Sequence, residues 1–155
     1  MRKPIKIIFI SLVTIVVILF TATIIMGISP ISFGMHDNFN NENGVAAKGY
    51  DVVAYFKENK AIKGADEYTT EWNNVTWKFS SNENLEAFKA TPEKYKPCYG
   101  GYCAFAIGKG FIAPSDPNFW SINDERLFFY SNEDVKNDAL KDIENVITSG
   151  DKNWK

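Results

Sequence analysis

The chain has 155 residues, which is enough for one domain and an appendage, and its 15% aromatic and 45% hydrophobic content can build a packed core. Seventeen basic and nineteen acidic residues give a net charge of -2, so no positive field exists that would attract a phosphate backbone. These properties argue against extensive disorder and against nucleic acid as a partner.

The amino-terminal segment has the character of a membrane anchor. A basic end, residues 1–6, precedes a run over residues 7–28 that contains no charged side chain. About 20 apolar residues allow a helix to cross a bilayer core of roughly 30 Å. The alternative, a cleaved signal peptide, needs a shorter apolar region and a small-residue cleavage site, which "MGISPIS" matches poorly. We therefore expect an uncleaved transmembrane helix over residues 7–28.

The charge distribution around this run predicts the topology. Basic residues precede the run and few follow it closely, so the amino end should stay in the cytoplasm. Residues 29–44 are rich in Asn, Ser and Gly without apolar periodicity and predict a flexible tether. Residues 45–155 should form the domain, outside the cytoplasm, in a single-pass protein of the cell membrane.

The pattern within residues 45–155 predicts two antiparallel hairpins and flanking helices. "EYTTEWNNVTWKFSS" alternates apolar and polar residues around Asn73-Asn74, a pair that tolerates the positive φ of a tight turn. A helix should follow, since Ser80 and Glu83 have capping-box spacing. "FWSINDERLFFY" indicates a second hairpin, and "SNEDVKNDALKDIENVITSG" has helical spacing from Ser131 to near Gly150. Strands and helices without a βαβ rhythm predict a small single α+β domain.

Several short runs, taken together and in order, resemble the YHS-domain family. They are "GYDVVAYF", "WKFSSNENLEAF", "PEKY", "YGGYCAFA", "DPNFW", "RLFFY" and the closing "KNW". YHS domains occur alone or attached to metal-handling and oxygenase proteins. The most similar variety is the exported YHS-domain (seleno)protein, whose hallmark is the same Tyr-Gly-Gly-Tyr-Cys-Ala run. The resemblance implies an extracytoplasmic binding module with a metal or small ligand near Cys103.

The chain departs from this family where metal is bound. Metal-binding members have a cysteine in an opening "D-P-V-C-G" and two in "F-C-S-x-x-C", and the second pattern aligns here with Phe79 to Asn84. Ser80 and Asn84 stand at the cysteine positions, and hydroxyl and amide groups are poor ligands for soft ions. The usual family metal site is therefore expected to be absent. The single histidine, His36, lies in the predicted tether.

Three interpretations stay open for Cys98 and Cys103, the only cysteines. In an oxidising compartment they could form a disulfide, because Gly100-Gly101 lets the two Cα atoms approach. Two thiolates could instead bind a soft metal ion such as copper(I). In the third interpretation Cys103 is a small buried hydrophobe and Cys98 is incidental. We expect Cys103 to matter more, because it belongs to the hallmark run.

The candidate ligand-binding segment comprises Tyr99, Gly100, Gly101, Tyr102 and Cys103. The glycines allow a close backbone approach, and tyrosine hydroxyls near the thiol could line a small pocket, although each ring alone also suits the core. The following "GKGF" lacks the hydroxyl residue of a P-loop, which argues against nucleotide binding.

No catalytic residue is predicted. Asp51 suits the cap of a short turn and Asp116 the start of a turn, and a nucleophile in residues 45–155 would lack a histidine base. The first hypothesis is a membrane-anchored binding module for a metal or small ligand at Cys103. The alternatives are a structural or protein-interaction domain with an unknown partner, and a thiol redox protein.

Overall fold

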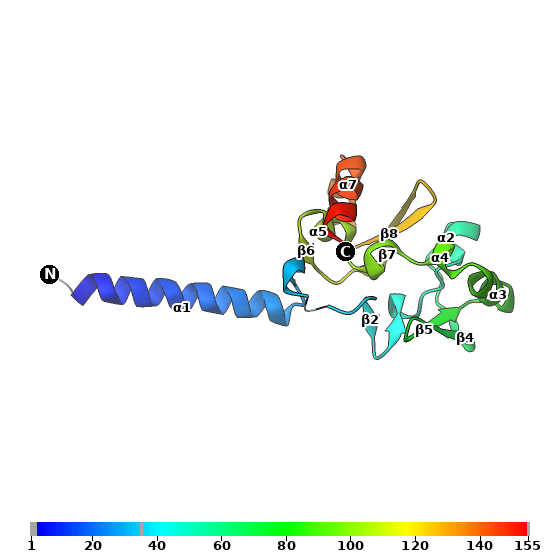
Figure 1. Ribbon diagram of the computed structural model, residues 1–155, viewed down its shortest axis with the longest axis horizontal. Helices are drawn as coiled ribbons and strands as arrows, with labels where there is room; N and C mark the ends of the chain where they lie inside the picture. The colour runs from blue at the N-terminus through cyan, green and yellow to red at the C-terminus, as the bar shows by residue number, and fades with distance from the viewer. Residues whose placement is uncertain (1–2, 35, 155) are drawn as a thin grey trace.

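Helix α1 (Lys3–Ile25) projects from one end of an α+β domain with antiparallel hairpins and helices (Figure 1). This computed structural model describes residues 3–34 and 36–154, with side chains from Ile10 onward among the helical residues. The basic end predicted over residues 1–6 lies outside the residues whose side chains are described. Within the described part of the chain, no helix combines the length and apolarity that a membrane crossing requires.

Helix α1 ends in a glycine cap. Gly27 has a φ of 71°, and its N–H donates to the Ile24 carbonyl at 2.9 Å. The Ile28 N–H donates to the Thr23 carbonyl, also at 2.9 Å. These two bonds make a Schellman motif, which satisfies carbonyls that the last turn of a helix leaves unpaired. The helix therefore stops sharply at the point where the domain begins.

The segment predicted as a flexible tether, residues 29–44, packs on the domain. It contains strand β1 (Ser29–Pro30), the 3-10 helix η1 (Ile31–Phe33) and strand β2 (Asn41–Glu42). Strand β1 pairs antiparallel with β6 (Phe111–Ile112), and the side chain of Phe39 is buried in the core. The domain thus begins well before residue 45. A single buried ring and two-residue strands leave no periodicity in the sequence, so composition alone suggested a tether.

The first predicted hairpin is confirmed. Strands β4 (Ala65–Trp72) and β5 (Val75–Phe79) are joined by Asn73 and Asn74, whose φ angles are 52° and 63°. Strand β3 (Val45–Ala46) pairs parallel with β5 and antiparallel with β2, which completes a four-stranded sheet in the order β2-β3-β5-β4.

The second predicted hairpin is also confirmed, as strands β7 (Asp116–Asn123) and β8 (Arg126–Tyr130). Its turn consists of Asp124 and Glu125, both with positive φ. Side chains alternate between the two faces of a strand, and β8 uses both faces. Leu127 and Phe129 belong to the core cluster around Trp77, while Phe128 and Tyr130 belong to a second cluster around Ile107. Strand β8 therefore lies between the two core clusters and contributes side chains to both.

The remaining helices are short, and they are α2 (Ala54–Lys57), α3 (Asn82–Ala90), α4 (Pro92–Tyr95), α5 (Ala104–Gly108), α6 (Glu133–Leu140), α7 (Ile143–Asn153) and the 3-10 helices η2 (Ala47–Gly49) and η3 (Cys98–Gly101). The single helix predicted after the second hairpin is in fact two, α6 and α7. Asn132, not Ser131, caps α6 through a bond from the Val135 N–H at 2.9 Å.

Helix α3 follows the first hairpin as predicted, but its cap is Ser81. The Ser81 hydroxyl accepts the Asn84 N–H at 3.2 Å. Ser80, which the capping-box spacing suggested, turns its hydroxyl toward Asp51 instead. The Asp51 carboxylate accepts the proton of the Ser80 hydroxyl, whereas the first turn of the helix offers N–H donors, and the oxygen of the neighbouring Ser81 accepts one of these as the cap.

Candidate functional site

The Tyr-Gly-Gly turn in η3 is a place of close backbone contact. Tyr99, Gly100 and Gly101 have φ angles of 54°, 60° and 77°, three consecutive residues in the left-handed region. The Asn40 N–H donates to the Gly100 carbonyl at 2.8 Å. A Cβ at Gly100 would lie 2.1 Å from the Asn38 carbonyl oxygen, so only glycine fits. The predicted role of Gly100 in a close backbone approach is confirmed.

Tyr99 ties this turn to helix α7. Its hydroxyl lies 2.9 Å from a carboxylate oxygen of Asp151 and 3.1 Å from the Ile147 carbonyl. The ring lies directly over Gly150, where a Cβ would be 2.5 Å from the hydroxyl oxygen. Burial and then the neighbouring Asp151 carboxylate raise the pKa of Tyr99, so the phenol stays protonated as a donor. A left-handed tyrosine is costly, and this anchorage holds it in place.

Arg126 joins the turn and α7 from the start of β8. Its guanidinium forms a bidentate pair with Asp151, with nitrogen–oxygen distances of 2.9 and 2.6 Å. Its Nε also donates to the Cys98 sulfur at 3.2 Å. The hydrogen bond from Arg126 lowers the pKa of Asp151. Burial raises the pKa of Cys98, and the hydrogen bond from Arg126 partly opposes that rise.

These groups line a depression of about 690 Å³ on the domain surface. Its walls come from residues distant in the chain: His36, Asn38, Phe39, Lys96, Cys98, Tyr99, Gly100, Arg126, Asp151 and Trp154. We call this the Cys98 depression. It combines a thiol, a guanidinium–carboxylate pair and aromatic surface, and it is large enough for a small organic molecule.

His36 belongs to this site although the sequence placed it in a tether. Its ring centroid lies 5.1 Å from that of Trp154 and 6.0 Å from that of Tyr102. Tyr102 lies beside a second, smaller depression of about 470 Å³, which His36 also lines. The imidazole therefore stands between the two hollows.

Cys103 occupies a different environment from Cys98. It is only 1% exposed at the start of α5, where its N–H donates to the Ala113 carbonyl at 3.0 Å. Both cysteines are free thiols. Neither Cys103 nor Gly101 lines the Cys98 depression, whereas Tyr99, Gly100 and Cys98 do. The structure thus divides the candidate segment between core and surface, and the accessible thiol is Cys98.

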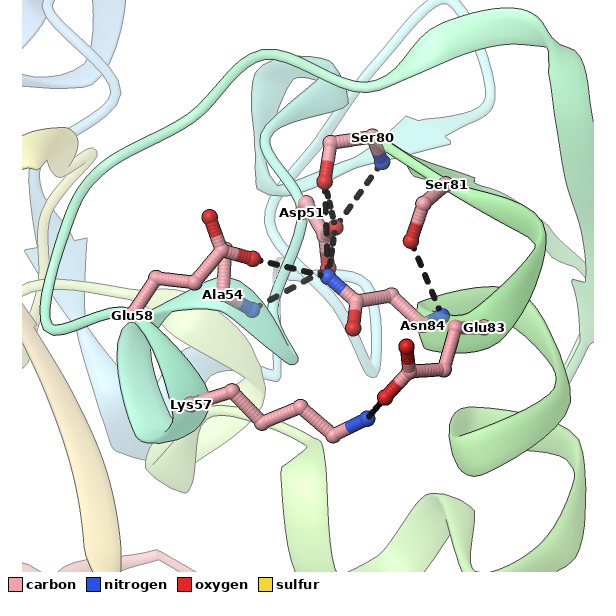
Figure 2. A network of polar contacts seen from close by, with 8 residues as sticks. All are labelled: Asp51, Ala54, Lys57, Glu58, Ser80, Ser81, Glu83 and Asn84. Atoms are coloured by element: carbon pink, nitrogen blue, oxygen red, sulfur yellow. Dashed lines mark hydrogen bonds and ion pairs between the residues drawn. The ribbon is translucent and has the colours of Figure 1, made fainter.

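The described residues contain no group of three or more His, Cys, Asp or Glu side chains that could hold a metal ion. At the positions that the sequence resemblance aligns with metal-binding cysteines, Ser80 and Asn84 form a polar junction with the buried Asp51 (Figure 2). One Asp51 oxygen accepts the N–H groups of Val53 at 2.9 Å and Ala54 at 3.2 Å, which confirms its role as a cap.

The second Asp51 oxygen completes this junction. It accepts the Ser80 N–H at 2.8 Å, the Ser80 hydroxyl at 2.7 Å and the Asn84 amide at 2.8 Å. The Asn84 amide also reaches Glu58 at 3.2 Å. Asp51 is 0% exposed, and its acceptor sites face protein donors on every side. We call this group the Asp51 junction, and its contacts leave it a structural role.

Sequence reasoning missed half of the Cys98 depression. Arg126 and Asp151 were assigned no role, because residues 25 apart without a motif give no sign that they will meet. Trp154 was noticed only as part of the closing "KNW".

Comparisons with protein-family models, with curated proteins and with solved structures found no match for this chain.

Proposed function

We propose that this protein is a membrane-anchored, extracytoplasmic YHS-like module that binds a small ligand in the Cys98 depression. The observation that carries the proposal is the Arg126–Asp151 pair, which stands half-exposed between a thiol and aromatic side chains. Sites for small molecules combine apolar walls with a few placed polar groups, and this depression has both.

The chemistry of the depression favours a small molecule with a planar anionic group and an apolar body. The Arg126 guanidinium presents a fork of donors that matches a carboxylate, and Asp151 occupies this fork in the free protein. A ligand carboxylate would exchange places with Asp151. Phe39 and Trp154 would contact the apolar part of the ligand.

The Cys98 thiol gives weaker support to the redox alternative. Reactive thiols have a lowered pKa and lie in an electropositive, partly exposed setting. Arg126 supplies the positive charge, but burial raises the pKa of Cys98 and outweighs it. Copper(I) binding by the thiolates of Cys98 and Cys103 stays a prediction that metal analysis can test directly.

Anchorage in the membrane is supported by the sequence of the first helix and by its surroundings. The run over residues 7–28 has no charged side chain. The described apolar side chains of α1 are largely exposed, and the helix extends away from the domain (Figure 1). A lipid bilayer would cover this apolar surface, and the basic amino end would stay in the cytoplasm.

Ligand binding is tested with the full chain purified in nanodiscs. Benzoate serves as the probe for a planar anion with an apolar body, and copper(I) under reductant serves as the metal probe. We expect benzoate to shift the NMR signals of the Arg126 and Trp154 side chains. In Arg126→Gln, benzoate should no longer shift the Trp154 signal. Lys141→Gln is the matched control, because Lys141 forms an exposed ion pair with Asp138 outside the depression. No shift with either probe would favour a structural or protein-interaction domain.

Topology is tested in intact cells. The domain should be digested by external protease and should stay in the membrane pellet after an alkaline wash. A protected domain, or a mature protein that begins after residue 30, would overturn the proposed anchor.

A further inference from the structure

We propose that two exposed phenylalanines, Phe33 and Phe111, insert into the surface of the bilayer and hold the domain in one orientation. We call this pair the phenylalanine collar. The side chain of Phe33 is 50% exposed and that of Phe111 is 44% exposed, although both lie at the junction of domain and helix. The inference rests on the proposed membrane anchor and names a second contact between the domain and the lipid.

The β1–β6 pair presents Phe111 on its outer face. Directly opposed residues of two paired strands point to the same side, and Pro30 stands opposite Phe111. The other opposed pair, Ser29 and Ile112, points inward and is buried. The two-residue ladder therefore separates an inner face, which the core covers, from an outer face on which the large apolar ring of Phe111 is 44% exposed.

Phe33 joins this face to the surface of α1. Its ring centroid lies 6.4 Å from that of Phe20, in an edge-to-face arrangement. Phe20 is itself exposed, as are the other described apolar side chains along the helix. The collar is thus continuous with the apolar surface that the proposed anchor gives to lipid, and this continuity identifies the lipid as its partner.

The connection between helix and domain is too short to act as a tether. Three residues, 26–28, separate the end of α1 from the start of β1. Gly27 fits against Pro114, whose side chain would lie 3.6 Å from an added Cβ. The Ile31 N–H donates to the Gly110 carbonyl at 3.0 Å and extends the β1–β6 contact. The domain therefore sits directly on the helix end, where the collar reaches the lipid headgroups.

Aromatic side chains at such positions favour the boundary between lipid and water. The phenylalanine ring is large and wholly apolar, so it gains by entering the acyl side of this boundary, as the Trp, Phe and Leu side chains of interfacial amphipathic helices do. Two such rings beside the helix end would act with α1 as three points of contact. A domain held at three points cannot rotate freely about the helix axis, so its outward surface is fixed.

The experiment measures how deeply single spin labels lie in nanodiscs that contain the full chain. Labels are placed by Phe33→Cys and Phe111→Cys in a Cys98→Ser background, since Cys103 is buried and unreactive. Leu140→Cys is the matched control, because Leu140 is 43% exposed on α6, outside the collar. Glu86→Cys reports on α3, at the end of the domain opposite α1 (Figure 1). Val17→Cys reports on the middle of α1.

We expect positions 33 and 111 to collide with oxygen, relative to a water-soluble nickel complex, at least about threefold more often than position 140. Position 86 should resemble 140, and position 17 should show the highest ratio of all. If 17 lies in lipid while 33 and 111 match 140, the collar is wrong and the anchor stands. If 17 also matches 140, the anchor itself is wrong, and the collar falls with it.

Discussion

Two polar clusters of this molecule, the Asp51 junction and the Cys98 depression, are each built around a carboxylate, but they differ in burial and in hydrogen-bond partners. In the junction a carboxylate at 0% exposure accepts five hydrogen bonds from backbone and side-chain donors. In the depression the Asp151 carboxylate meets a guanidinium, and both side chains stay more than one third exposed. The contacts of the first cluster are all buried and satisfied within the protein, while the second cluster stays open to solvent.

The contrast shows why residue type alone misplaces a site. The resemblance to metal-binding domains directs attention to Ser80 and Asn84, and these side chains point into the closed junction. The accessible chemistry lies where η3, β8 and α7 meet, around a cysteine that does not belong to the hallmark run. The structural cluster and the candidate binding site differ in how fully their polar groups are hydrogen-bonded and in how exposed these groups are, rather than in residue type.

The largest effect is expected for Asp51→Asn. The amide nitrogen of the new side chain would face donors, and the Ser80 and Asn84 groups would lose their acceptor inside the protein. Leaving buried donors unpaired costs about 1–3 kcal/mol each, so we expect unfolding free energy to fall by about 3 kcal/mol or more. Urea unfolding followed by fluorescence measures this loss.

The matched control for the junction is Asp116→Asn. Asp116 also accepts an N–H two residues ahead, from Asn118 at 2.9 Å, but it does so at the partly exposed start of strand β7. Its replacement should cost less than about 1 kcal/mol, since water can satisfy the freed donors. Equal losses for the two variants would show that the junction contributes no more to stability than a partly exposed carboxylate at a strand end.

The next effect concerns the turn that shapes the depression. Gly100→Ala puts a Cβ against the Asn38 carbonyl and keeps a left-handed backbone, so we expect it to lower the unfolding free energy by about 2–4 kcal/mol. Benzoate binding should weaken as well, because the segment around Asn38 forms one wall of the depression.

Gly34→Ala isolates the steric part of this effect. Gly34 has a φ of 61°, matched to the 60° of Gly100, and an added Cβ there would meet nothing within 4 Å. Gly34→Ala should lower the unfolding free energy only by the cost of a left-handed alanine, about 1–2 kcal/mol. If both variants unfold at the same urea concentration, the close approach at Gly100 is not important for stability.

Substitutions of the two cysteines test the same contrast between buried and exposed groups, with smaller expected losses of unfolding free energy. Cys103→Ser places a hydroxyl in a fully buried site, and an unsatisfied hydroxyl there should cost about 1–3 kcal/mol. Cys98→Ser should cost less than about 0.5 kcal/mol, since Arg126 can donate to oxygen as it does to sulfur. Thermal melts with and without reductant test this asymmetry. Equal losses that vanish in reductant would indicate a disulfide between the two.

The sequence predicted those parts of the fold that repeat along the chain. Both hairpins have period-2 alternation around a polar turn, and the helices have apolar residues at helical spacing, so local physics was sufficient. The break between α6 and α7 was missed because the apolar spacing continues across it. The contacts of residues 29–44 were missed because they depend on Phe39 and two-residue strands, which have no period.

The site was predictable only where it is local. Tyr99 and Gly100 were found because three consecutive special backbone angles need a glycine-rich run, and a run is visible in sequence. The pairing of Arg126 with Asp151, and the approach of His36 to Trp154, depend on how distant segments fold together. Cys103 was favoured over Cys98 as a ligand because a hallmark motif does not reveal burial.

The Arg126–Asp151 pair should have a small, pH-dependent effect on stability. The folded-state pKa of Asp151 is lowered, so its contribution is present above the pKa of the unfolded chain and is lost as pH falls through the folded value. Both side chains are more than one third exposed, and screening by solvent limits the pair to about 0.2–1 kcal/mol. Arg126→Gln should therefore lower stability slightly at pH 7, and less at pH 3.

The smallest structural change, with the sharpest readout, is the effect of Arg126→Gln on the Cys98 thiol. Arg126 opposes the rise in the pKa of Cys98 that burial causes, so its removal should raise that pKa further. Alkylation requires the thiolate, so the rate with iodoacetamide near pH 8 should fall, and its midpoint should move further above the usual value of about 8.5. Lys141→Gln should leave both unchanged, because its ion pair lies elsewhere. A faster reaction in Arg126→Gln would mean that the guanidinium shields the sulfur from the reagent more than it stabilises the thiolate, and the depression would then need to open before a ligand could reach Cys98.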